Sequence, residues 1–184
     1  INLKERFPKA KVLILEKGLL PQGASTKNAG FACFGSISEI IDDLKSHSEE
    51  EVTQLISKRW NGLQLLRNNL GDETIDFKPY GGYELFLTED ESTYNQCLQK
   101  LPIINELLKP LFRNDVFAKE VDRFAFHGIK EYLVFNPFEA QIDTGKMMNA
   151  LLQKAITNNI LILNQVEVTT YLEKKDSVEV DLGD

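Results

Sequence analysis

The chain has 184 residues, of which 42% are hydrophobic and 27% are charged, and its formal net charge is −7. This composition is typical of globular proteins, and the length allows one domain or two small ones. The negative charge argues against a nucleic-acid-binding face, and no segment approaches the ~20 apolar residues that would cross a bilayer.

Two cysteines, Cys33 and Cys97, are too far apart for a metal-binding motif and too few for a disulfide framework. Buried free thiols in a reducing, cytoplasmic compartment are the interpretation that we favour. No His, Cys or acidic residues show the spacing of metal ligands, so a metal site is not expected.

The first predicted element is a strand over residues 10–16, which is rich in aliphatic residues and lies between Pro8 and Gly18. Its uniformly apolar character predicts burial on both faces, as in a parallel sheet. Residues 1–7 have the pattern of a helix end. A first strand and a glycine-rich turn, which normally precede such a strand in a dinucleotide-binding fold, are not found before it. The chain is therefore predicted to be an internal piece of a larger cofactor-binding protein.

Two helices are predicted next, each with a capping box at its start. Ser36 and Glu39 open a helix over residues 36–47, and Ser48 and Glu51 open a long one that Gly71 ends. The long helix has apolar side chains at helical spacing: Val52, Leu55, Ile56, Trp60, Leu63, Leu66 and Leu70.

The middle of the chain has a different composition, with aromatic residues around a Gly-Gly pair. It predicts strands over residues 83–87, 115–121 and 131–135. Thr88 and Glu91 predict the cap of a helix over residues 89–100, and Pro102 predicts the start of another helix that reaches about residue 109.

The last part returns to an α/β pattern. Asp143 or Thr144 is predicted to cap a helix over residues 145–157, and a buried strand follows at 160–163. Residues 166–172 and 177–182 alternate in polarity and predict a hairpin.

Glu16 ends the first strand and leads into the small-residue loop from Gly23 to Gly30. A carboxylate at this position can accept hydrogen bonds from both hydroxyl groups of an adenosine ribose. The loop allows close backbone approach and carries donors at Ser25, Thr26 and Asn28, which suits a diphosphate. An ordinary strand-end glutamate followed by an ordinary turn is the alternative.

At this point the chain resembles the FAD-dependent D-amino-acid oxidase superfamily, which includes glycine and sarcosine oxidases. The resemblance rests on residues 12–18 and 23–30, on the strand at 80–86 and on residues 143–152. It covers nearly the whole chain in order, with residues 11–31 the most distinctive part. Two parts of the family pattern are missing, namely the first strand with its G-x-G-x-x-G turn and the C-terminal part of both domains.

The resemblance implies a fold of the α/β class (α+β overall), in which a partial FAD/NAD(P)-binding Rossmann-like domain is interrupted by a mixed-sheet substrate domain. Residues 1–74 and 141–184 are predicted to form the FAD-binding domain, and residues 75–140 the inserted part. The residues that the resemblance assigns to FAD are Glu16, Lys17, Ala24, Ser25, Lys27, Asn28, Ala29, Gly30 and Val166.

The implied reaction is oxidation of a C–N bond in an amino acid or secondary amine. Recognition of a substrate carboxylate favours Arg or Tyr side chains of the insert. The candidates are Tyr83, Arg123 and Tyr132, with Tyr80 and His127 as weaker ones. No catalytic residue is assigned from the sequence.

Two alternatives stay open, a nicotinamide-dependent dehydrogenase and a non-catalytic α/β binding or interaction module. Without the first strand and its turn, we expect this chain to bind FAD weakly or not at all. Residues 11–16 would then form an apolar sheet edge, and we expect some self-association through it.

Overall fold

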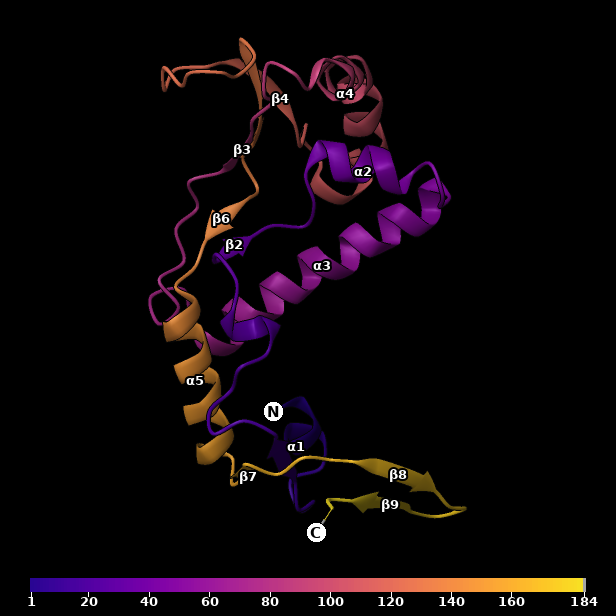
Figure 1. The fold of residues 1–184 in the computed structure, drawn as a ribbon, viewed down its shortest axis with the longest axis vertical. Coiled ribbons are helices and arrows are strands. Elements are labelled where there is room, and N and C mark those ends of the chain that lie inside the picture. The colour runs from indigo at the N-terminus through magenta and orange to yellow at the C-terminus, as the bar shows by residue number, and fades with distance from the viewer. Residues whose placement is uncertain (184) are drawn as a thin grey trace. The chain divides into compact units, whose positions relative to one another are not determined.

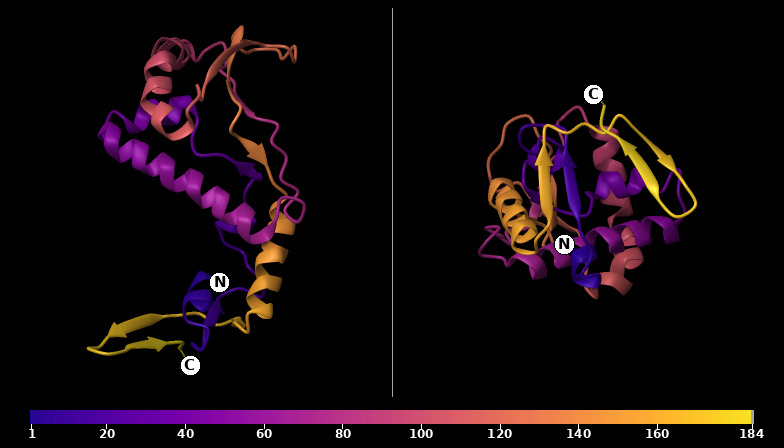
Figure 2. Two further views of the ribbon diagram at one scale, coloured as in Figure 1. Left: turned by 180° about the vertical axis from the view of Figure 1, so that it is seen from behind. Right: turned by 90° about the horizontal axis from the view of Figure 1, so that it is seen from below.

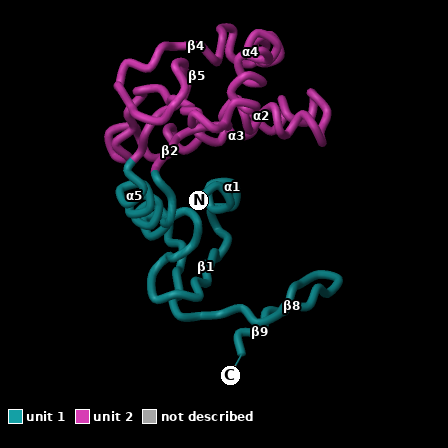
Figure 3. The backbone as a smooth tube through the Cα atoms, turned by 45° about the horizontal axis from the view of Figure 1, so that its top comes forward, with its two compact units in different colours: residues 1–29, 143–184 teal, residues 30–142 magenta. Residues whose placement is uncertain are grey.

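The computed structural model describes residues 1–183, and these residues divide into two compact units (Figure 3). Unit 1 consists of residues 1–29 together with the described residues from Asp143 onward, and unit 2 of residues 30–142. The mixed α/β content agrees with the predicted fold class.

Unit 1 is built around a parallel pair of strands. Strand β1 (Leu13–Glu16) lies parallel to β7 (Leu161–Asn164) (Figure 2). In this pair Leu13 lies opposite Leu161 and Glu16 opposite Asn164. The other elements of this unit are α1 (Asn2–Arg6), the 3₁₀ turn η1 (Ala24–Thr26), α5 (Thr144–Thr157) and the hairpin strands β8 (Thr170–Glu173) and β9 (Val178–Asp181).

The two parallel strands are much more exposed than the sequence predicts. Leu13 is 49% exposed and Leu161 is 66% exposed, although both were expected in buried strands. Two strands alone leave most of both sheet faces without neighbouring layers, whereas a wider sheet would cover them. The structure also changes the expected edge, because one side of β1 is already paired with β7.

Unit 2 contains a three-stranded antiparallel sheet in the order β3-β5-β4, formed by β3 (Gly82–Glu84), β5 (Tyr132–Asn136) and β4 (Ala118–Val121). Its helices are α2 (Ile37–Asp43), α3 (Glu49–Leu70) and α4 (Glu91–Phe112) (Figure 1). A short antiparallel pair, β2 (Phe31–Ala32) with β6 (Ala140–Gln141), joins the two ends of this unit and was not predicted.

Both predicted capping boxes are confirmed. The Ser36 and Ser48 side chains accept hydrogen bonds from the backbone N–H groups of Glu39 and Glu51, and the two glutamate side chains accept from the serine N–H groups in return. Helix α3 ends at Gly71, whose φ of 85° few other residues adopt.

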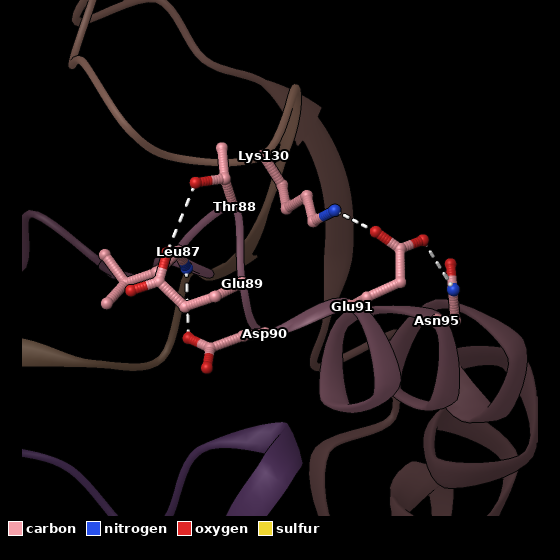
Figure 4. Close-up of polar contacts among 7 residues, drawn as sticks. All are labelled: Leu87, Thr88, Glu89, Asp90, Glu91, Asn95 and Lys130. Carbon is pink, nitrogen blue, oxygen red and sulfur yellow. Dashed lines mark hydrogen bonds and ion pairs between the residues drawn. The ribbon is translucent and has the colours of Figure 1, made fainter.

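The predicted cap at Thr88 and Glu91 is wrong, and so is the division into two helices. Helix α4 begins after Asp90 and continues through Pro102 and Pro110 to Phe112. The side chain of Glu91 pairs with Lys130 and accepts a hydrogen bond from Asn95, while the Asp90 carboxylate accepts one from the Leu87 N–H (Figure 4). Packing of the inner face of α4 maintains one helix, although each proline removes a backbone donor.

The hydrophobic core of unit 2 lies between the helices and the sheet. Phe34 stacks on Phe112 with ring centroids 4.8 Å apart, and the Trp60 ring meets Phe112 edge-on at 5.3 Å. The buried aliphatic members of this core come from α2, α3, α4, the residues just before β4, and β5: Ile37, Ile40, Ile41, Val52, Ile56, Ile104, Leu108, Val116 and Val134.

Residues 30–74 pack with residues 75–142 in one compact unit, whereas the predicted domain boundary placed them with the flanking segments. The core explains this grouping, since Phe34 and Ile56 pack against the inner face of α4. The assignment of residues 30–74 to the FAD-binding domain stays a prediction.

Candidate functional site

Glu16 lies at the carboxyl end of β1, where it is half-buried. Its Oε1 atom accepts a hydrogen bond from the Gly18 N–H at 2.7 Å, which fixes the carboxylate beside the chain reversal that follows the strand. Within residues 1–183, no hydrogen bond to its Oε2 atom is found. One carboxylate oxygen is thus held by the backbone, and the other is available to a hydroxyl group of a ligand.

Two predicted residues flank Glu16. The Val166 N–H donates to the backbone carbonyl of Glu16 at 3.0 Å, which continues the β1–β7 pairing beyond the strands. Lys17 forms an exposed ion pair with Glu167 at 2.5 Å. The structure therefore brings Glu16, Lys17 and Val166 together at the carboxyl end of the parallel pair, the usual position of ligand sites in α/β sheets.

The loop that follows is held in shape by its own side chains. Thr26 donates from Oγ1 to the Gly23 carbonyl at 2.9 Å, and the Asn28 Nδ2 atom donates to the carbonyls of Ala24 and Ser25 at 3.2 and 3.0 Å. The Oδ1 atom of Asn28 accepts a hydrogen bond from the Thr144 hydroxyl at 2.9 Å. The sequence suggested Asn28 as a ligand donor, whereas in the structure its amide donates within the loop.

Other polar groups of this loop point to no partner in the described chain. The Ser25 hydroxyl and the Lys27 ammonium group form no internal hydrogen bond or ion pair within residues 1–183, and both residues are exposed together with Ala24 and Ala29. A hydroxyl donor and a cation on one short loop fit the chemistry of a diphosphate. The residues present in unit 1 thus fit the adenosine diphosphate part of FAD.

Gly30 is placed differently from the rest of the predicted set, because it is the first residue of unit 2. It is buried, with a φ of 79°, and its carbonyl accepts a hydrogen bond from the Ile142 N–H at 2.8 Å. Within unit 2, Gly30 therefore closes the β2–β6 pair.

In unit 2, two of the three predicted substrate residues lie together. Arg123 donates a hydrogen bond to the Tyr83 hydroxyl, and its guanidinium carbon lies 5.4 Å from the centre of the Tyr83 ring. The same hydroxyl donates to Glu120 Oε2 at 3.2 Å. Burial and then the negative charge of Glu120 raise the pKa of Tyr83, so that its hydroxyl stays protonated as a donor.

Tyr132 lies apart from this pair. Its ring packs under Lys119, whose ammonium nitrogen is 3.5 Å from the ring centre. Tyr132 and Tyr83 occupy positions of opposite parity in the paired strands β5 and β3, since Tyr83 lies opposite Phe135. Side chains of adjacent residues in a strand point to opposite faces, so Tyr132 and Tyr83 face different sides of the sheet. His127 and Tyr80 are exposed and take no part in the Tyr83–Arg123 cluster.

The connection that carries Arg123 is tethered at its far end. The Lys130 N–H donates to the Phe86 carbonyl, the Thr88 N–H donates to the Gly128 carbonyl, and the Lys130 side chain pairs with Glu91 at the start of α4 (Figure 4). These contacts hold residues 128–130 against residues 86–88.

Glu139 is a titratable residue that is not among the candidates predicted from the sequence. It lines a cavity of about 280 Å³ together with Glu84 and the buried amide of Asn136. The pKa of Glu139 is raised to about 7, chiefly by burial and also by the negative charges of Glu84 and Glu39, and the hydrogen bond from Asn136 opposes the shift. No sequence motif surrounds Glu139, and only the fold places it beside these groups.

No helix among residues 1–183 is both long and apolar enough to cross a membrane. The same residues contain no group of three or more His, Cys, Asp and Glu side chains arranged to bind a metal ion.

Comparison with protein families identifies the chain. The model of the FAD-dependent oxidoreductase (DAO) family matches residues 1–183, and the chain therefore belongs to this family. The predicted resemblance is confirmed at this level, and the family is one of flavin-dependent oxidoreductases. A search of curated proteins found no match.

Solved structures of this family share the fold. Glycine oxidase from Geobacillus kaustophilus is 16% identical, with a TM-score of 0.62 over 95% of this chain and 45% of that protein. L-Amino acid deaminase from Proteus myxofaciens is 15% identical, with a TM-score of 0.66 over 99% of this chain and 39% of that protein. L-Proline dehydrogenase from P. horikoshii is 18% identical, with a TM-score of 0.57 over 97% of this chain and 44% of that protein. The chain thus spans less than half the length of these relatives.

Proposed function

We propose that the protein containing this chain is an FAD-dependent oxidoreductase that oxidises a C–N bond of an amino acid or a secondary amine. The observation that carries the proposal is the arrangement of Glu16 at the end of the parallel β1–β7 pair, followed by the loop at residues 23–30. The names of the similar structures, which include an oxidase, a deaminase and a dehydrogenase of amino acids, support this substrate class.

In this proposal, the residues of unit 1 bind the adenosine diphosphate part of FAD. Glu16 accepts hydrogen bonds from the ribose hydroxyl groups, and the backbone of Val166 borders the adenine. Ser25 and Lys27 face the diphosphate, with Lys17, Ala24, Asn28, Ala29 and Gly30 completing the set that the family resemblance assigns. The flavin, when bound, accepts two electrons from the substrate carbon that bears the nitrogen.

The Tyr83–Arg123 pair is proposed to bind the carboxylate of the substrate. A guanidinium group and a phenol hydroxyl both donate hydrogen bonds, and a carboxylate accepts from both. The Tyr83 hydroxyl has a single proton, which it donates to Glu120 Oε2 at 3.2 Å in the structure and would donate to the substrate carboxylate in its place. Tyr132 is the weaker candidate, because it faces the other side of the sheet.

The first experiment is an FAD titration of this chain and of the protein extended upstream, followed by the visible absorption spectrum. We expect a structured flavin spectrum from the extended protein and weak or no binding by the chain alone. In the extended protein, Glu16→Ala is expected to weaken FAD binding at least about tenfold, since hydrogen bonds to charged groups contribute ~1.5–3 kcal/mol. Glu5→Ala, a change of an exposed carboxylate in α1, is the control and should bind FAD normally.

Anaerobic reduction of the bound flavin provides the second part of this experiment. Arg123→Leu is expected to raise the amino-acid concentration at which half of the bound flavin is reduced. For amines without a carboxylate, the concentration that reduces half of the flavin should stay unchanged. Lys119→Leu removes a nearby cation that contacts Tyr132 and serves as the control.

If neither this chain nor the upstream-extended protein binds flavin, the proposal fails and a non-catalytic binding module becomes the better description.

A further inference from the structure

Helix α5 begins with a contact to the loop at residues 23–30 that no sequence motif predicts. The Thr144 hydroxyl donates to the Asn28 Oδ1 atom at 2.9 Å, across 116 positions of sequence. Thr144 is the first residue of α5, directly after the N-cap residue Asp143, whose carboxylate accepts from the Lys146 N–H at 2.8 Å. The start of the helix is therefore fixed by its own cap, and the Thr144 side chain is left to bind the loop.

Asn28 connects Thr144 to the backbone of the loop through further hydrogen bonds. Its Nδ2 atom donates to the carbonyls of Ala24 and Ser25, the first two residues of η1. An amide side chain can accept at Oδ1 and donate at Nδ2 at the same time, whereas a carboxylate cannot donate and an aliphatic side chain can do neither. This one amide thus links the Thr144 hydroxyl to the carbonyl groups of residues 24 and 25.

We propose that Thr144 is a positioning residue for cofactor binding, which holds the loop at residues 23–30 in the conformation that receives the diphosphate. The inference rests on the proposed function, because that function assigns the diphosphate to this loop. Thr144 need not touch the ligand, since it acts through Asn28.

The test compares ligand binding by the complete, upstream-extended protein and by variants of Thr144. Thr144→Val keeps the shape of the side chain and removes the donor, so FAD and ADP are expected to bind about tenfold more weakly, equivalent to ~1.4 kcal/mol for one hydrogen bond. Adenosine lacks the diphosphate and should bind with unchanged affinity. Thr144→Ser restores the hydroxyl and is expected to restore FAD and ADP binding.

Thr157→Val is the matched control, because the Thr157 hydroxyl lies on the same helix and donates only to the Gln153 carbonyl at 2.8 Å. This variant should bind all three ligands like the parent protein. Combining Thr144→Val with Asn28→Ala should weaken FAD binding no more than Asn28→Ala alone, since both changes break the same connection.

The outcomes separate the two proposals. Failure of the parent protein to bind FAD would overturn the proposed function and this inference with it. Normal FAD binding by the parent together with unchanged FAD and ADP affinity in Thr144→Val would overturn the inference alone. Equal losses of affinity for ADP and adenosine in Thr144→Val would point to a general structural role for Thr144 and would also overturn the inference. The same conclusion would follow if Thr144→Ser did not restore FAD and ADP binding.

Discussion

The Glu139 side chain lies directly over Gly82, where an added Cβ atom would come within 1.8 Å of the Glu139 Oε2 atom. The neighbouring Gly81 has a φ of 76°, and a Cβ atom there would come within 2.3 Å of the Phe135 ring. The Gly-Gly pair thus allows both a carboxylate and an aromatic ring to lie against the backbone at the start of β3. This close approach places Glu139 between Glu84 and Asn136, where its charged form is disfavoured.

The raised pKa of Glu139 predicts that the stability of the protein depends on pH. Because the folded state binds the proton more tightly than the unfolded state, this contribution is fully present below pH 4.5 and is lost as pH rises toward about 7. Glu139→Gln is neutral at every pH and is expected to be more stable than the parent at pH 8 by about 1 kcal/mol, allowing for partial exposure.

Urea unfolding of both proteins at pH 5 and pH 8 measures this effect. Glu89→Gln changes an exposed carboxylate just before α4 and is the control for loss of one negative charge. If the stability difference between Glu139→Gln and the parent is the same at both pH values, the Glu139 carboxyl group does not titrate in this range.

At the scale of elements, α4 is the helix for which the prediction from the sequence and the structure differ most. Pro102 is exposed and lies in the interior of the helix, where it cannot donate to the preceding turn. On the opposite side of the same helix, Ile104 and Leu108 are buried in the core. Asn105 is also buried, and its side-chain amide donates to the Phe117 carbonyl at 2.8 Å and accepts from the N–H groups of Val116 and Phe117. These tertiary contacts keep residues on both sides of Pro102 in one helix.

We therefore expect Pro102→Ala to stabilise the protein by about 1 kcal/mol, because the regained helical hydrogen bond exceeds the added freedom of the unfolded chain. The midpoint of urea unfolding provides the measurement. Gln99→Ala, at an exposed position of the same helix, controls for helix propensity and should change stability little. A loss of stability in Pro102→Ala would mean that the proline bends α4 into the shape that the core requires.

At the scale of the whole molecule, the exposed parallel pair of unit 1 is the feature with the clearest consequence for assembly. Leu13, Ile14, Leu161 and Leu163 are each at least 42% exposed. Apolar side chains on strands with unpaired outer edges favour pairing with another chain. A second copy of this chain carries the same edges and is the partner that we expect.

Sedimentation velocity over a range of concentrations tests this expectation. The chain as given should self-associate, and Leu13→Lys should shift the distribution toward the monomer, because a charge on the strand opposes burial. Leu65→Lys, at a comparably exposed position of α3, should leave self-association unchanged. A single monomeric species at high concentration would show that the β1–β7 pair does not mediate assembly.

Local patterns in the sequence determined the helices with capping boxes, the hairpin and the family. Ser36, Glu39, Ser48 and Glu51 act within a few residues of one another, so their pairing requires no knowledge of the rest of the chain. Glu16 and the loop at residues 23–30 could be predicted as a candidate site in the same way, because a strand and its following turn are adjacent in sequence.

Only the tertiary structure decided which distant residues meet. The direct pairing of β1 with β7, the Tyr83–Arg123 contact, the Thr144–Asn28 hydrogen bond and the site of Glu139 all join segments that are separated in sequence. The same long-range packing made α4 one helix across Pro102. Periodicity and capping report interactions within about one or two turns of a chain, whereas burial, ion pairing and the raised pKa of Glu139 depend on neighbours that folding supplies.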